Sequence, residues 1–368
     1  MSASSRYVAD IGRARRDLPT PALVLDAETL RANIAAMATW AQDKVAIRPH
    51  AKIHKSVEIA RLQVEAGACG LTVATIWEAL ALAEAEPDSI LIANELIDPG
   101  KLDRLAEAAR ESQYLIAVDS EDGARALNRA TAAAGSRVGV LIDIDVGMGR
   151  CGVRSIDEAI KLAATVQTLP ALDLRGVMGY EGQVVTEPDR AVRAQQATDA
   201  MDILAGYIDA VETAGFQIEI VSAGGTNTFD MTGAHARVTE LQAGSYAVMD
   251  AWYATLTPTF RPALTVLARC ISRQGDTAVL DCGTKAITVE YMKPRIPEGY
   301  GTIREVHEEH MLLDVSDADR PSLGEALELT IGYCGGTINL HDVYFVAEGE
   351  EVVDVWPIRA RGPGRGPA

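Results

Sequence analysis

Short apolar runs alternate with amphipathic segments from Pro21 to about Asp250. The runs are rich in Val, Ile and Leu, and the segments between them repeat apolar residues every three or four positions, which is typical of helices packed on a core. Eight runs are predicted strands, near residues 45–48, 70–74, 90–93, 114–118, 138–142, 174–178, 218–222 and 241–246. Eight strands separated by helices favour an α/β fold with a closed (β/α)8 TIM-like barrel; an open doubly wound sheet is the alternative, because a strand count does not establish closure.

The pattern changes after Tyr253, where runs such as TAVLDCG, HMLLDV and ALELTIGY are short, rich in β-branched residues and separated by turn residues. This texture predicts a small all-β domain. We therefore assign residues 21–253 to the barrel and residues 254–362 to a C-terminal β domain, and we expect residues 1–20 to pack on the latter. The Gly- and Pro-rich end of the chain, residues 363–368, is predicted to be a disordered tail.

Composition narrows the class of protein. The 368 residues are 48% hydrophobic and 23% charged, so the chain can bury a large core. Its 34 basic against 52 acidic residues give a net charge of -18, which argues against a nucleic-acid partner and favours a soluble enzyme or a binding protein. An anionic small-molecule substrate would therefore need local positive charge. The five cysteines form no CxxC pair, which favours reduced thiols and a cytoplasmic location. No apolar run is long enough to predict a membrane segment.

The segment AIRPHAKIHKS places Arg48, His50, Lys52 and His54 at alternate positions. Alternate residues of a strand share one face, so a continuous strand would point these four cationic groups to the same side. Barrel enzymes carry their catalytic groups at the carboxyl ends of the strands and in the loops that follow. We therefore expect this face to reach the active site.

Lys52 is the strongest catalytic candidate of this segment. Burial and neighbouring positive charges both lower the pKa of a lysine, and a neutral amine can form a Schiff base. His50 is expected to contact a cofactor and His54 is a second catalytic candidate, whereas Lys55 points to the opposite face. The alternative is that Lys52 is an ordinary solvated charge.

A second candidate site is the stretch SAGGTNT, which directly follows a predicted strand. A glycine-rich turn at that position exposes backbone N–H groups, which together with hydroxyls can bind an anion, although such turns are often only tight turns. The following run, ELQAGSYAVMD, ends the last predicted strand nearby. A lysine on the first strand and an anion site on the last two would span one pyridoxal phosphate. The candidate phosphate contacts are Ser222, Gly224, Gly225, Thr226, Gly244, Ser245 and Tyr246.

Arg150 and Tyr180 complete the candidate site. Arg150 lies in IDIDVGMGRCGV, whose glycine spacing lacks the context of a dinucleotide fingerprint. Its guanidinium can bind a cofactor hydroxyl or a substrate carboxylate, or form a structural salt bridge. Tyr180, at the end of the sixth predicted strand, can stack on a cofactor ring, relay a proton, or belong to the core.

Together, RPHAKIHKS, DVGMGRCGV, SAGGTNT, ELQAGSYAVMD and TINLHD with VVDVWPIRARG resemble the D-threonine aldolase and D-serine dehydratase family of alanine-racemase-like, fold-type III pyridoxal phosphate enzymes. The resemblance extends over residues 17–362. It implies a barrel plus a β domain, a homodimer whose active sites the partner chain completes, and Lys52 as the Schiff-base lysine. It also implies that the phosphate contacts named above surround the cofactor phosphate, with Arg150 and Tyr180 near the ring.

One motif departs from that family. Its members carry a pair of metal ligands before the NLHD motif, and aligning GYCGGTINLHD on Thr337 places Tyr333 and Gly335 at those positions. Glycine has no ligand side chain and tyrosine is a poor zinc ligand, so we predict that the metal site is lost. Recruitment of a metal by Cys334, or by His341 and Asp342, is the alternative.

Three reactions of an amino acid follow from the resemblance, because which bond breaks at the substrate Cα decides the product. The first is a lyase that cleaves D-β-hydroxy amino acids to glycine, or an analogue, and an aldehyde, with Tyr333 near the β-oxygen. The second is a dehydratase that releases a keto acid and ammonia. The third is a racemase in which Tyr333 and Lys52 act as opposing bases. A non-catalytic pyridoxal phosphate carrier is the fourth possibility, against which the β domain argues.

Overall fold

The computed structural model describes residues 7–316 and 321–362, which fall into two compact units. The barrel unit comprises residues 38–52 and 60–244, and the β unit comprises residues 7–37, 53–59, 245–316 and 321–362. The predicted disordered tail, residues 363–368, lies outside the described residues. No helix in the described ranges is both long and apolar enough to cross a membrane.

Eight parallel strands form the barrel unit. They are β2 (Ala46–Ile47), β3 (Leu71–Val73), β4 (Ile90–Ile92), β5 (Tyr114–Val118), β6 (Val138–Asp143), β7 (Leu172–Gly179), β8 (Ile220–Ala223) and β9 (Glu240–Leu241), in the order β2-β9-β8-β7-β6-β5-β4-β3. A bridge between His50 and Thr72 joins the two ends of this order. There the N–H of Ala51 donates to Thr72 O and the N–H of Thr72 donates to Pro49 O, each at 2.8 Å. The barrel is therefore closed, and the predicted fold class is confirmed.

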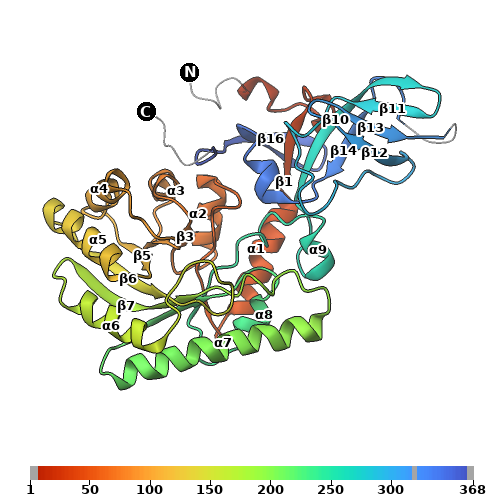
Figure 1. Cartoon of the computed structure of the whole chain (residues 1–368). Helices are drawn as coiled ribbons and strands as arrows, with labels where there is room; N and C mark the ends of the chain where they lie inside the picture. Colours follow the sequence, from red (N-terminus) through yellow and green to blue (C-terminus); the bar gives the residue numbers. More distant parts are fainter. Residues whose placement is uncertain (1–6, 317–320, 363–368) are drawn as a thin grey trace. The chain divides into compact units, whose positions relative to one another are not determined.

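The strands form where the sequence has short, almost wholly apolar runs. All three residues of β4 are at most 1% exposed, and all five of β5 are buried. Parallel strands covered on both faces need such continuous apolar runs rather than alternation. Figure 1 shows helices α4, α5 and α6 on the outer side of β5, β6 and β7, which is the layer that covers them.

The five helices α3 to α7 begin at polar N-cap residues whose side chains accept backbone N–H groups. Ser120 Oγ accepts the N–H of Gly123 at the start of α5, and Ser155 and Glu158 form a capping box at α6. Such caps satisfy N–H groups that have no partner within the helix. The helices are α1 (Ala27–Ala41), α2 (Val57–Glu65), α3 (Ile76–Leu82), α4 (Pro99–Ala108), α5 (Glu121–Ala134), α6 (Ile156–Gln167), α7 (Arg190–Thr213) and α8 (Phe229–Thr232), with η4 at Ala83–Ala85.

The β unit contains a second eight-stranded sheet. Its path is β12-β13-β11-β10-β1-β15-β16, and β14 pairs with β10. The strands are β1 (Ala22–Asp26), β10 (Leu264–Gln274), β11 (Thr277–Leu280), β12 (Thr302–Val306), β13 (Met311–Asp314), β14 (Ala326–Thr330), β15 (Val343–Glu348) and β16 (Glu351–Pro357), with short helices η2 (Val8–Asp10), η3 (Arg15–Asp17), α9 (Tyr253–Leu256) and α10 (Cys334–Ile338). The predicted all-β character holds for the strands, while α9 and α10 are helical turns that the pattern did not indicate.

The first strand differs from the expected domain division. β1 lies within residues 21–253, the range expected for the barrel, yet it pairs antiparallel with β10 and parallel with β15. Ala22 and Val24 of β1 pack in one cluster with Leu18, Phe345 and neighbouring residues. Residues 7–20 bond to the same sheet, where the N–H of Gly12 donates to Val352 O at 2.8 Å. The first strand–helix repeat of the sequence is thus shared between the two units.

Candidate active site

The segment that carries Lys52 is a strand only at its start. β2 ends at Ile47, His50 forms the bridge to Thr72, and residues 51–54 form a turn. The prediction that Arg48, His50, Lys52 and His54 share one strand face is therefore wrong beyond His50. The turn is needed because the chain leaves the barrel wall here to enter α2.

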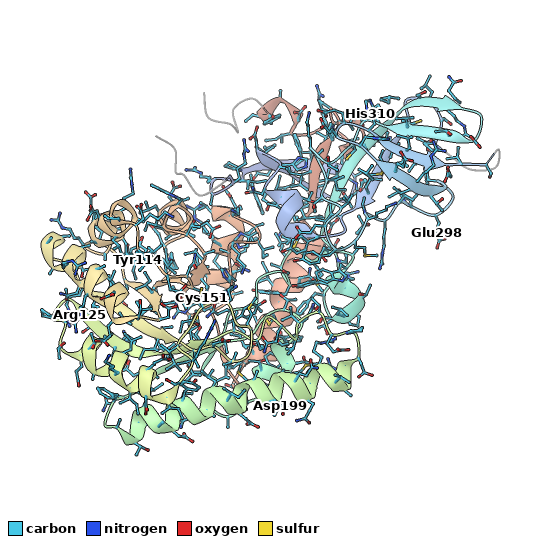
Figure 2. All side chains as sticks on the ribbon, in the orientation of Figure 1. Tyr114, Arg125, Cys151, Asp199, Glu298 and His310 are labelled. Atoms are coloured by element: carbon cyan, nitrogen blue, oxygen red, sulfur yellow. The ribbon has the colours of Figure 1, made fainter. Side chains whose placement is uncertain are left out.

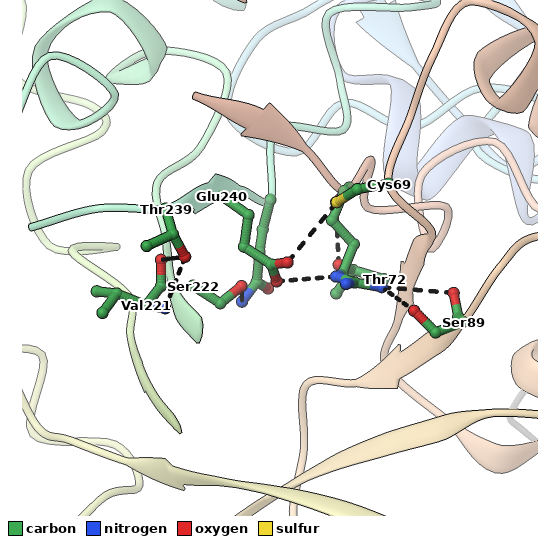
Figure 3. Close-up of polar contacts among 9 residues, drawn as sticks. Cys69, Thr72, Ser89, Val221, Ser222, Thr239 and Glu240 are labelled. Carbon is green, nitrogen blue, oxygen red and sulfur yellow. Dashed lines mark hydrogen bonds and ion pairs between the residues drawn. The ribbon is translucent and has the colours of Figure 1, made fainter. Parts of the chain in front are cut away.

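Arg48 lies at the amino-terminal end of the barrel rather than at the predicted catalytic end. Its Nε donates to Glu240 Oε1 at 2.8 Å, and Nη1 donates to Ser89 Oγ at 2.8 Å (Figure 3). Glu240 begins β9 and Ser89 precedes β4. Both side chains of the ion pair are 5% exposed. Gly70 makes room for the guanidinium, since a Cβ there would lie 2.1 Å from Nη1. Arg48 is thus part of a buried structural ion pair.

Lys52 is half-buried in the barrel unit. Burial lowers the pKa of its ammonium, the positive charge of Arg150 lowers it further, and Glu78 opposes both effects. Within the part of the chain that the structure describes, Lys52 forms no ion pair. Its environment favours the neutral amine, the form that attacks a carbonyl or removes a proton.

Arg150 and Tyr180 line one small pocket at the carboxyl ends of β6 and β7, together with Asp143, Cys151 and Met148. The guanidinium carbon of Arg150 lies 5.8 Å from the centre of the Tyr180 ring, within cation–π range. Figure 2 shows Cys151 among the barrel loops. No ion pair of Arg150 is found among the described residues, so the alternative of a structural salt bridge has no partner there.

The loop that carries Arg150 is held by Asp145. Its Oδ1 accepts the N–H groups of Gly147 at 3.0 Å and Gly149 at 2.9 Å. Both glycines have positive φ angles, 118° and 68°, which side-chain-bearing residues rarely adopt. The glycine spacing therefore serves a tight loop over the end of β6.

Asp143 and Glu95 form a carboxyl pair that the sequence analysis missed. Asp143 is 5% exposed, and burial, the charge of Glu95 and a hydrogen bond to it raise the pKa of Asp143 to about 8, against the opposing charge of Arg150. Two close carboxylates do not both ionise readily, so the pair holds a proton near neutral pH. The sequence could have indicated this pair, because both residues lie at the ends of predicted strands.

The glycine-rich loop follows β8, as predicted. The N–H of Gly224 donates to Glu181 Oε2 at 3.2 Å, and the N–H of Gly225 donates to Thr228 Oγ1 at 3.1 Å. These two N–H groups have acceptors within the chain, which differs from the expectation that they are exposed to an anion. Ser222 Oγ accepts from Gln242 Nε2 at 2.9 Å.

The loop lies beside the pocket of Arg150 and Tyr180. A Cβ on Gly225 would lie 3.5 Å from the Tyr180 ring. Gly244 packs on His50, where a Cβ would lie 2.5 Å from the His50 carbonyl oxygen. Thr226 is 3% exposed. The barrel unit thus brings the following predicted residues to the carboxyl ends of its strands: His50, Lys52, Arg150, Tyr180, Ser222, Gly224, Gly225, Thr226 and Gly244.

Ser245 and Tyr246 continue the chain into the β unit. Tyr246 is 2% exposed, and its ring packs on Phe260 with centroids 5.5 Å apart. Ser245 O accepts the N–H of Met249 at 2.6 Å. The Tyr246 ring is therefore a core side chain of this unit.

Tyr333 lies in an aromatic cluster of the β unit with Trp252, Tyr253 and Tyr291. The ring centroid of Tyr333 lies 5.0 Å from that of Tyr291 and 6.2 Å from that of Trp252. Burial, with the neighbouring Cys334 and Tyr291, raises the pKa of the Tyr333 phenol well above its usual value. Tyr333 is consequently a neutral hydrogen-bond donor near neutral pH and a poor base.

His54 is buried in the β unit and is 0% exposed. Its Nδ1 accepts the N–H of Ser56 at 3.2 Å, and its carbonyl accepts the hydroxyl of Tyr344 at 2.6 Å. These contacts give His54 a structural role in the turn before α2.

The residues considered for metal binding have other partners. His341 Nε2 lies 2.7 Å from Ala286 O, and Asp342 forms an ion pair with Arg361. A Cβ on Gly335 would lie 2.9 Å from the Tyr333 hydroxyl, so the tyrosine occupies the space next to this position. Among the described residues, no group of three or more His, Cys, Asp or Glu side chains is arranged to hold a metal ion.

Two family models match this chain, one after the other along the sequence. Residues 25–251 match the family described as alanine racemase, N-terminal domain. The chain belongs to this family. Residues 263–347 match a putative serine dehydratase domain.

Two curated relatives of this alanine racemase family member are aldolases. The chain is 36% identical to a D-threonine aldolase of Arthrobacter sp., covering 94% of this chain and 93% of the relative. It is 30% identical to a 3-hydroxy-D-aspartate aldolase of Paracoccus denitrificans, covering 96% and 95%. The crystal structure of D-threonine aldolase from Filomicrobium marinum matches with a TM-score of 0.91 and 34% identity, covering 95% of this chain and 98% of that one. The predicted family and the prediction of an enzyme are confirmed.

Proposed function

We propose that this protein is a pyridoxal-phosphate-dependent lyase that cleaves D-β-hydroxy amino acids to glycine, or an analogue, and an aldehyde. The observation that carries the proposal is Lys52, an amine with a lowered pKa at the carboxyl end of a closed barrel, next to Arg150. The aldolase relatives set the reaction class.

The residues of the barrel unit fit the cofactor. Lys52 offers a neutral amine for an aldehyde group, and Arg150 offers hydrogen-bond donors next to an aromatic ring. Ser222 and Thr226 of the SAGGTNT stretch carry hydroxyls for a phosphate, and Gly225 leaves a space the size of one methyl group against Tyr180. When bound, pyridoxal phosphate supplies an electron-withdrawing ring that stabilises negative charge at the substrate Cα.

Cleavage then requires two proton transfers, one from the β-hydroxyl of the substrate and one to its Cα. The substrate loses the proton of its β-hydroxyl as the Cα–Cβ bond breaks and the aldehyde forms, and Cα takes up a proton to give glycine. Lys52 is assigned both transfers: its neutral amine, the form that burial and Arg150 favour, accepts the β-hydroxyl proton, and the resulting ammonium donates a proton to Cα. Arg150 is assigned the orientation of an anionic group through its planar set of donors.

Aligned on Thr337, Tyr333 takes the position of a metal ligand of the resembled enzymes, and on that ground we assign it to the β-oxygen. The space next to Gly335 is taken by the Tyr333 hydroxyl, and the raised pKa keeps the phenol neutral, so that it can orient the oxygen through a hydrogen bond. We therefore expect aldol cleavage that a chelator does not inhibit.

Dehydration is the second candidate, because residues 263–347 match the putative serine dehydratase domain. Racemisation is less supported, since it needs a second base and the raised pKa of Tyr333 disfavours a phenolate.

The decisive assay incubates the purified protein and pyridoxal phosphate with D-threonine, D-allo-threonine, D-serine or D-alanine, with and without a chelator. We expect aldehyde and glycine from the first two substrates, unchanged by chelator. Keto acid with ammonia would replace aldol cleavage by dehydration, and inversion alone would replace it by racemisation. Loss of aldehyde with chelator, restored by a divalent metal, would overturn the assignment of Tyr333.

We further infer a cytoplasmic homodimer. All five cysteines are free thiols, which is typical of a reducing compartment, and the homodimer follows from the family resemblance. Light scattering coupled to size exclusion tests the assembly, and cell fractionation tests the location.

A further inference from the structure

Glu181 is a fully buried carboxylate directly after Tyr180, with 0% of its surface exposed. Its Oε1 accepts the hydroxyls of Thr228 at 2.6 Å and Thr232 at 2.5 Å, and its Oε2 accepts the N–H of Gly224 at 3.2 Å. None of the described residues forms an ion pair with it. Burying a carboxylate without a counter-ion costs free energy unless hydrogen-bond donors compensate. The three donors around Glu181 provide that compensation and fix the position of its side chain.

The three donors come from both ends of one segment. Gly224 opens the glycine-rich loop with a φ of +84°, Thr228 closes it, and Thr232 ends α8. Glu181 itself lies two residues after the end of β7 (Leu172–Gly179). The carboxylate thus ties the loop after β8 to the loop after β7, across more than forty residues of sequence.

The other half of the loop is held independently. Arg193 Nε donates to Asn227 O at 3.1 Å, and Asn227 Nδ2 donates to Val185 O at 2.9 Å. Loss of the Glu181 contacts would therefore free the N–H of Gly224 and the two threonine hydroxyls, while Asn227 keeps its contacts to Arg193 and Val185.

We propose that Glu181 is a positioning residue that holds the Gly224 end of this loop in the conformation that receives the phosphate group of the cofactor. The proposal rests on the proposed function above. The proposed effect of Glu181 on cofactor binding is opposite to that of its charge alone, because a negative charge near a phosphate would by itself weaken phosphate binding. A role in positioning predicts that removing this charge weakens phosphate binding, whereas a purely electrostatic role predicts the opposite.

The central variant is Glu181→Gln. An amide has one acceptor and one donor group, so it cannot accept from both hydroxyls and from the N–H of Gly224 at once. Thr232→Val removes one donor at nearly constant volume, and Thr232→Ser restores the hydroxyl. Thr131→Val is the matched control, because the Thr131 hydroxyl is equally buried but donates to Leu127 O in α5.

The measurement is the dissociation constant of the full-length apoprotein for pyridoxal phosphate and for pyridoxal, which lacks the phosphate, by absorbance titration. We expect Glu181→Gln to weaken pyridoxal phosphate binding about tenfold to a hundredfold, the range for a lost hydrogen bond to a charged group, with little change for pyridoxal. Thr232→Val should weaken pyridoxal phosphate binding less than Glu181→Gln does, and Thr232→Ser should have a dissociation constant close to that of the wild type. Thr131→Val should leave the dissociation constants of both ligands unchanged.

Equal weakening of both ligands in the Glu181 and Thr232 variants, or tighter pyridoxal phosphate binding in Glu181→Gln, would overturn the proposal. If Glu181→Gln does not fold, the contrast between Thr232→Val and Thr232→Ser decides. Wild-type protein that binds neither ligand would instead contradict the proposed function.

Discussion

Buried charged groups are paired at one end of the barrel and have shifted pKa values at the other. At the amino-terminal end, Arg48 is paired with Glu240 and Ser89, and all its contacts are to groups of the chain. At the carboxyl end, Lys52 has a lowered pKa and Asp143 a raised one. Arg48 and Lys52 are four residues apart, so the difference comes from their surroundings. Satisfied charges stabilise a fold, whereas charges shifted from their ordinary state are typical of a site that acts on a ligand.

The largest expected effect is on activity, at the carboxyl end. Lys52→Ala should abolish uptake of pyridoxal phosphate into a coloured complex and lower aldehyde production on the order of a thousandfold, within the range for a lost acid–base group. Lys55→Ala is the matched control, because Lys55 Nζ donates to Ala360 O at 3.3 Å and is assigned no role in the reaction. An active, coloured Lys52→Ala protein would remove the basis of the proposed function.

The next effect is on stability, at the amino-terminal end. Arg48→Met should lower the free energy of unfolding by about 3–5 kcal/mol, because it leaves the Glu240 carboxylate buried without its partner. Urea denaturation measures this loss. Arg48→Met combined with Glu240→Leu should lose less than the single variant, since no unpaired charge remains. If the double variant were the less stable protein, the ion pair itself would be the source of stability.

A third prediction concerns pH. The pKa of Asp143 is raised to about 8 by burial and Glu95, so the native state binds a proton that the unfolded chain releases near its ordinary pKa of about 3.9. The stability from this proton is complete below about pH 4 and is lost as the pH rises through about 8. The Asp143→Asn variant has no titrating carboxyl group at this position, so it lacks this pH dependence. The difference in unfolding free energy, wild type minus variant, should therefore fall across this window in urea titrations, and parallel pH curves would contradict the shift.

The smallest effect is at the cap of α6, just after the Arg150 loop. Ser155 Oγ accepts the N–H of Glu158 at 3.3 Å, so Ser155→Ala should lower the free energy of unfolding by about 1 kcal/mol. Ser155→Asp, which keeps an acceptor, should retain most of the stability. The catalytic constants should stay at wild-type values in both variants, because this cap does not touch the pocket. A large fall in turnover would show that the loop depends on the cap.

Local sequence was sufficient for the barrel strands and most helices, because apolar runs and N-cap residues act within a few positions of themselves. It also predicted Lys52, Arg150, Tyr180 and the glycine-rich loop as parts of the site, since each lies at or shortly after the end of an apolar run. It did not reveal that β1 pairs in the β unit, because a strand's apolar pattern does not specify its partner.

Only the tertiary structure decided which charges are satisfied. The sequence placed Arg48 and Lys52 on the same predicted face, but the depth of each residue in the barrel and its neighbours from other strands made one an ion pair and the other a candidate catalytic amine. The contacts of Glu181 likewise join residues 43 to 51 positions apart. Burial and hydrogen bonding depend on such distant neighbours, which periodicity along one chain segment does not contain.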